Sequence, residues 1–174
     1  MTTRLSTPVL VGVVLLGLIG AAVVLATVDF DAWAIRRQSV RLIATLNKPA
    51  GEKNPLAIAL RVRRIRDFFA QQPVLQPGDP LPAIQTREEL TAVAGQALLA
   101  AESIRVRVLD RELTWTKPRT EALMRLAVEV VVQEGSETSQ LLRVYEVAWI
   151  REESRWVIAR AHSTDSIRRP AASE

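Results

Sequence analysis

The stretch SQLLRVYEVAWIREESRWVIARAHS (Ser139–Ser163) decides the fold of this chain. Its first part, Ser139–Ile150, is rich in β-branched, aromatic and leucine residues, and Arg155–Ser163 has the same character. The polar residues Arg151–Ser154 separate these two parts. Two apolar runs joined by a short polar turn are typical of a β-hairpin. The first run is apolar at odd and even positions alike, which predicts a central strand that is buried on both faces.

Two further strands are predicted before this hairpin. The run EALMRLAVEVVV (Glu121–Val132) ends at the loop Gln133–Ser139, where Gly135 can adopt the positive φ of a reversing chain. The preceding run, Ser103–Thr116, alternates apolar and polar residues, but the alternation slips by one residue near Val108–Leu109. A slip of this kind is typical of a β-bulge, which bends a long strand. The sequence therefore predicts a bent, mainly four-stranded antiparallel sheet.

Helical patterns precede the strands. Asp29–Asn47 carries apolar residues along one face, and a second helix is predicted from the cap Asn54, with an apolar stripe from Ile58 to Phe69. The other sides of this second helix carry arginines, which could hold phosphate groups but are more typical of a solvated face. These arginines are Arg61, Arg63, Arg64 and Arg66.

A third helix and an irregular segment complete the predicted domain. Thr86 and Glu89 have the spacing of a capping box, and apolar residues follow at helical spacing. The segment before them, Gln71–Gln85, contains four prolines and cannot be a regular helix. We expect it to wrap the edge of the domain or to form the lip of a cleft.

The N-terminal part has the composition of a membrane anchor. After a short polar N-terminus (residues 1–7), Pro8–Val28 contains no charged residue. About 20 helical residues at ~1.5 Å each span a hydrocarbon core of ~30 Å. We therefore predict an uncleaved transmembrane helix at residues 8–28. The alternative is a cleavable signal peptide, for which Val24-Leu25-Ala26 offers a weak cleavage site.

The charges around this segment leave its orientation open. Arg4 lies before it, and Arg36, Arg37 and Arg41 lie after it. Counting positive charges favours a cytoplasmic domain, whereas a very short, positively charged N-terminus suits a signal anchor that exports the domain on its C-terminal side. We expect a single-pass protein of the bacterial inner membrane with a periplasmic domain. Arg36, Arg37 and Arg41 are also candidates for contacts with anionic lipid headgroups.

Composition excludes several classes of site. The 174 residues include no cysteine and a single histidine, His162, so disulfides, thiol catalysis, cysteine–zinc sites and multi-histidine metal sites are ruled out within one chain. The net charge of +4 is mild, and no RNA-binding signature is present. Phosphate-binding loops and nucleophile elbows are also missing. We therefore predict no metal, no cofactor and no nucleic-acid partner.

The order of these elements resembles the nuclear transport factor 2-like superfamily, whose members form a cystatin-like α+β cone. The resemblance covers about Asn54–Pro170 and is carried by the segments TREELTAVAGQALLA, SIRVRVLDRELTW and RWVIARAHSTDSIRRP. It implies a domain at residues 54–170, preceded by a juxtamembrane helix and loop (29–53) and followed by a tail (171–174). One departure is that the early strand of this fold is not visible, since Val74–Leu75 or Ala83–Ile84 would supply only a short piece.

The resemblance leaves two functions open. Enzymes of this superfamily place an acid or base in the cone, commonly an Asp/His pair or an Asp with a Tyr, while many other members are non-catalytic. The candidate pocket residues here are Asp110, Trp115, Tyr145, His162 and Asp165. The first function is a non-catalytic, membrane-anchored domain of the cell envelope that mediates protein–protein interaction or assembly, for example as a homodimer through its sheet. The alternative is a small-ligand binder or an isomerase- or cyclase-like enzyme.

Overall fold

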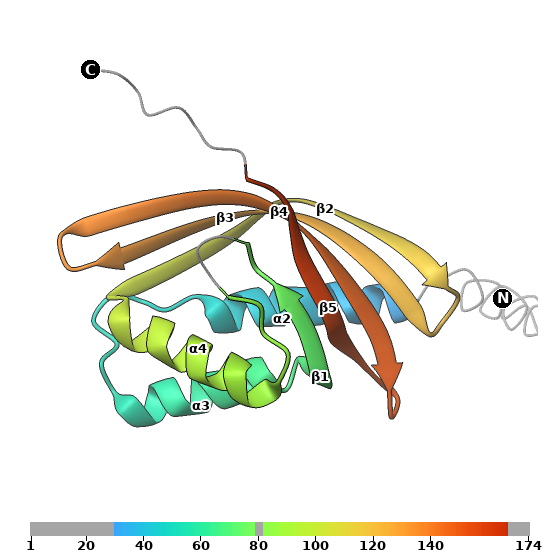
Figure 1. Ribbon diagram of the computed structural model, residues 1–174, viewed down its shortest axis with the longest axis horizontal. Coiled ribbons are helices and arrows are strands. Elements are labelled where there is room, and N and C mark those ends of the chain that lie inside the picture. The colour runs from blue at the N-terminus through green and yellow to red at the C-terminus, as the bar shows by residue number, and fades with distance from the viewer. Residues whose placement is uncertain (1–29, 79–81, 167–174) are drawn as a thin grey trace, which may run out of the picture. The chain divides into compact units, whose positions relative to one another are not determined.

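The structure is a computed structural model that describes residues 30–78 and 82–166 (Figure 1). Its helices are α2 (Phe30–Leu46), α3 (Pro55–Arg66) and α4 (Arg87–Ala100), and its strands are β1 (Phe69–Gln76), β2 (Ser103–Lys117), β3 (Glu121–Glu134), β4 (Glu137–Glu152) and β5 (Arg155–Ser166). The predicted membrane helix at residues 8–28 lies outside the described residues. Within the described part, no helix has both the length and the apolarity needed to cross a bilayer.

The five strands form one mixed sheet in the order β1-β5-β4-β3-β2. β2 to β5 are antiparallel neighbours, as predicted, and β4 is the central strand. The prediction of four strands is incomplete, because Phe69–Gln76 adds β1 in parallel to β5. Pro73 in this segment argues against a strand, but β1 lies at the edge of the sheet, where a proline is tolerated.

The stripe of the second helix was extended too far in the prediction. α3 ends at Arg66, with Asp67 as its C-cap, and Phe69 opens β1 instead of continuing the helix. The chain then returns along β1, since Leu75 and Ile84 exchange two backbone hydrogen bonds of 2.8 and 2.9 Å. Part of the proline-rich segment therefore covers the sheet edge.

The predicted bulge is confirmed. The register of β2 with β3 jumps from Val108–Val128 to Asp110–Ala127, so Leu109 is the extra residue. Both predicted hairpin turns are also present, between β3 and β4 and between β4 and β5. The strands are long and curved, and α3, α4 and the Ala34–Leu46 part of α2 lie on one face of the sheet (Figure 1).

The helix caps follow the sequence. The side chain of Asn54 accepts from the backbone N–H groups of Leu56 and Ala57, and Thr86 and Glu89 form the predicted capping box of α4. The C-terminal end of α4 is capped from a distance by Lys48. Its Nζ donates to the carbonyl of Leu98 at 2.7 Å and to that of Ala101. A cation at this position complements the negative end of the helix dipole.

Candidate functional site

The candidate residues of the cone lie at different depths. Asp110 is exposed beside the bulge, and its Oδ1 accepts a hydrogen bond from the backbone N–H of Arg111 at 2.8 Å. The His162 side chain is 46% exposed, with its Nε2 3.3 Å from Oε2 of Glu146. Tyr145 and Trp115 are partly buried against the core, and the Trp115 ring centroid lies 5.6 Å from that of Trp156.

The sheet register keeps these residues apart. In the pairing of β4 with β5, Glu146 lies opposite His162, and Tyr145, the residue before Glu146, lies opposite Ser163. Because successive residues of a strand point to opposite faces, Tyr145 and His162 lie on different faces of the sheet. Asp110 is on β2, so the width of β3 separates it from β4. Among Asp110, Tyr145 and His162, the structure therefore brings no Asp/His or Asp/Tyr pair together. The side chain of Asp165 lies outside the described part of the chain.

A cluster of buried hydrophobic side chains lies in the core of the domain. Eight members of this hydrophobic cluster are at most 3% exposed: Ile35, Ile65, Leu98, Ala122, Met124, Trp149, Trp156 and Ile158. The buried Nε1 of Trp149 has no hydrogen-bond partner within the described ranges. An indole N–H can donate a hydrogen bond, but it cannot act as a general acid or base near neutral pH. Nor do the described residues bring three or more Asp, Glu or His side chains together as metal ligands.

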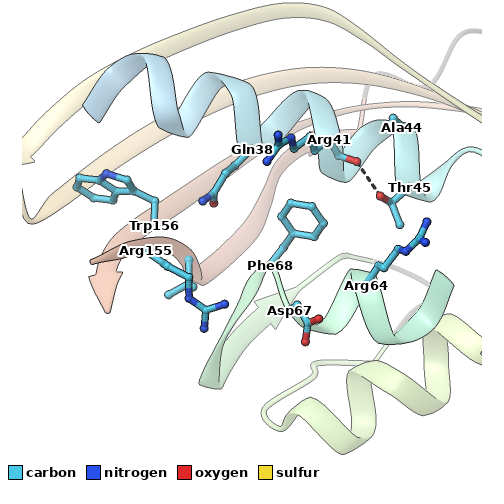
Figure 2. A pocket seen from close by; sticks show the side chains of 10 residues that line it. Gln38, Arg41, Ala44, Thr45, Arg64, Asp67, Phe68, Arg155 and Trp156 are labelled. Carbon is cyan, nitrogen blue, oxygen red and sulfur yellow. Dashed lines mark hydrogen bonds between the residues drawn. The ribbon is translucent and has the colours of Figure 1, made fainter. Parts of the chain in front are cut away.

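A cleft with a volume of about 490 Å³ lies between α2, the end of α3 and the start of β5 (Figure 2). We call it the arginine cleft. Its lining residues are Gln38, Arg41, Ala44, Thr45, Arg64, Asp67, Phe68, Arg155, Trp156 and Val157. Of the three arginines proposed as lipid contacts, Arg41 lines this cleft, while Arg36 and Arg37 are exposed elsewhere on α2.

Sequence reasoning did not predict the arginine cleft. Arg64 belongs to the arginine cluster of α3 that was assigned to a solvated face, and Arg155 was part of a strand. The only sequence pattern that could have indicated this cleft is that arginines recur near the ends of three elements. The cleft combines three guanidinium groups with one carboxylate, Asp67, whose Oδ1 lies 3.7 Å from Nη2 of Arg66.

The sheet face away from the helices is a second candidate surface, which we call the open face. Ala122, Met124, Val147 and Trp149 point into the core, so their strand neighbours point outward. Apolar outward residues meet in the cross-strand pairs Leu123–Ala148 and Ala127–Val144, and all four are partly exposed.

A row of alternating charge crosses the open face between these two pairs. Glu112 lies opposite Arg125, which lies opposite Glu146, which in turn lies opposite His162. The open face therefore combines apolar side chains from two central strands with charges of both signs.

No family model matches this chain, and no curated protein matches it in sequence. Solved structures match it in fold. A candidate scytalone dehydratase from Novosphingobium aromaticivorans has a TM-score of 0.64 at 12% identity, covering 79% of this chain and 86% of its own. A type 2 hexachlorocyclohexane dehydrochlorinase has a TM-score of 0.62 at 12% identity, covering 81% and 90%.

A third structure carries the name of the fold family. A candidate dehydratase of the nuclear transport factor 2-like family from Streptomyces avermitilis has a TM-score of 0.59 at 14% identity, covering 78% of this chain and 95% of its own. The α+β part of the expected fold is therefore confirmed: the chain has the cystatin-like fold of the nuclear transport factor 2-like proteins, with a five-stranded mixed sheet in place of the predicted four strands.

Proposed function

We propose that this protein is a non-catalytic, membrane-anchored domain of the cell envelope that assembles through the open face of its sheet. The observation that carries the proposal is the exposure of apolar side chains on that face, which none of the described helices covers (Figure 1). Membrane attachment is supported by the uncharged segment Pro8–Val28.

The open face has the chemistry of a self-complementary interface. An antiparallel sheet that faces water normally presents polar side chains there. Here the apolar pairs Leu123–Ala148 and Ala127–Val144 flank the charged pair Arg125–Glu146, which lies between them on the same face. In a two-fold interface each patch meets its own copy, so Arg125 of one molecule can face Glu146 of the other. A stable dimer needs about 800 Å² of such surface per partner.

The test is the substitution Val144→Lys in the full-length chain, purified in a mild non-ionic detergent. A charged ammonium at the centre of the open face is expected to convert a dimer into a monomer by light scattering, because burying it unpaired in the interface costs several kcal/mol. The matched control is Leu56→Lys on α3, where the native leucine is 68% exposed. A native chain that is already monomeric, or a V144K variant that still dimerises, would contradict the proposal.

The second candidate is an enzyme or ligand binder that uses the cone, and the names of the structural relatives favour it. Dehydratases and dehydrochlorinases remove a proton and a leaving group from neighbouring carbons, so they need a base beside the substrate. A direct test is chloride release from hexachlorocyclohexane by the purified chain. A rate above the buffer background that persists in Val144→Lys would favour this candidate over assembly alone.

A further inference from the structure

We propose that the arginine cleft binds a small soluble ligand in which a phosphate or carboxylate group is attached to an aromatic or other apolar body. The cleft lies on the helix side of the sheet, between α2, α3 and β5 (Figure 2). Assembly through the open face does not involve this cleft, so ligand binding and assembly can be measured separately.

The charge of the cleft points to an anion. Arg41, Arg64 and Arg155 come from three different elements, and among the described residues none of their side chains forms an ion pair or a hydrogen bond. Other arginines of the chain do have partners: Arg61 binds Glu52 at 2.8 Å, and Arg107 lies 3.4 Å from Glu129.

Arg41, Arg64 and Arg155 line one cleft, and their combined positive charge favours an anion there. Asp67, the carboxylate of the cleft, already lies near Arg66 at 3.7 Å. The guanidinium group presents a planar set of N–H donors that matches the oxygens of a carboxylate or phosphate. The polar lining therefore selects an anionic group.

The apolar lining points to a ring or another hydrophobic body. Phe68 lies at the middle of the labelled side chains in Figure 2, with Trp156 on the β5 side. The Trp156 ring is held in place by Trp115, at a centroid distance of 5.6 Å and an interplanar angle of 55°. Trp156 is only 3% exposed, so the partly exposed ring of Phe68 is the aromatic surface that a ligand ring can contact. A volume of about 490 Å³ is in the range of small-molecule sites.

The test uses phenyl phosphate as the probe, with inorganic phosphate and phenol as its two halves. Binding to the full-length chain in non-ionic detergent micelles is measured by isothermal titration calorimetry. We expect phenyl phosphate to bind more tightly than either half, because only phenyl phosphate contacts both the arginines and the Phe68 ring. Arg64→Gln and Arg155→Gln are each expected to weaken binding about tenfold, since each removes one charge-assisted contact.

The matched control is Arg111→Gln, an exposed arginine on β2 that does not line the cleft. It is expected to leave the affinity unchanged. Phenyl phosphate that does not bind, or that binds equally to R64Q and wild type, overturns the proposal.

A second series of titrations adds phosphatidylglycerol to the micelles. If phenyl phosphate binds equally well with and without the lipid, the result supports a soluble ligand. If the lipid abolishes phenyl phosphate binding, the proposal of a soluble ligand is overturned, because the lipid headgroup then occupies the cleft.

Discussion

Replacing Lys48 by methionine tests how the loop after α2 is attached to α4. Lys48 is only 5% exposed, which is unusual for a lysine. Its Nζ donates to the carbonyls of Leu98 and Ala101, which lie at the C-terminal end of α4 and have no further helix turn to bond to. Methionine has a similar length and fills the same space, but it provides no donor.

The expected cost combines opposing contributions. Each carbonyl that loses its partner in a buried position costs about 1–3 kcal/mol. Loss of the cation at the helix end adds up to about 1 kcal/mol. Against this, the variant no longer has to desolvate an ammonium group, which costs several kcal/mol. We expect the free energy of unfolding of Lys48→Met to fall by about 2 kcal/mol, or roughly a 1 M lower urea midpoint.

The assay is urea unfolding of the full-length chain in non-ionic detergent, monitored by the fluorescence of its four tryptophans. The matched control is Lys53→Met, an exposed lysine in the same loop, which is expected to change the free energy of unfolding by less than about 0.5 kcal/mol. If Lys48→Met were as stable as the native chain, the proposed cap of α4 would be refuted, because the two carbonyls would then have to be satisfied without the ammonium group.

Two further perturbations test the core and the anchor. Trp149 is 1% exposed on the central strand and fills the middle of the cone. Trp149→Ala is therefore expected to lower the free energy of unfolding by about 3–5 kcal/mol in the same urea assay. A cost below about 1 kcal/mol would mean that the cone is loosely packed there. Leu16→Arg places a charge near the middle of residues 8–28, where insertion of arginine into a bilayer costs about 3 kcal/mol. This variant should leave the membrane fraction on carbonate extraction while Leu16→Phe remains in it, and equal retention of the two variants would argue against a transmembrane helix.

Local patterns were sufficient where neighbouring residues determine the structure. The bulge at Leu109 is visible in the sequence because one inserted residue reverses the alternation of every residue after it. The capping box of Thr86 and Glu89 is also local, since its hydrogen bonds join residues three apart. Elements of this kind were predicted at nearly the observed positions.

β1 could not be predicted in the same way. Gln71, Gln72 and Pro73 have low strand propensity, and the segment becomes a strand because it pairs with β5, far along the chain. The same tertiary pairing decides that Phe69 leaves the helical stripe of α3 and opens the strand. Propensity describes a segment in isolation, whereas an edge strand depends on the partner that it meets.

The sequence by itself determined the three helices, the four long strands that follow them, and the bend of β2. It also excluded thiol and multi-histidine chemistry, since composition and short-range periodicity carry this information. Only the tertiary structure decided that Asp110, Tyr145 and His162 lie apart. It also decided that Arg41, Arg64 and Arg155 line one cleft. The physical reason is that a site joins residues distant in the chain, and their meeting depends on strand register and helix packing.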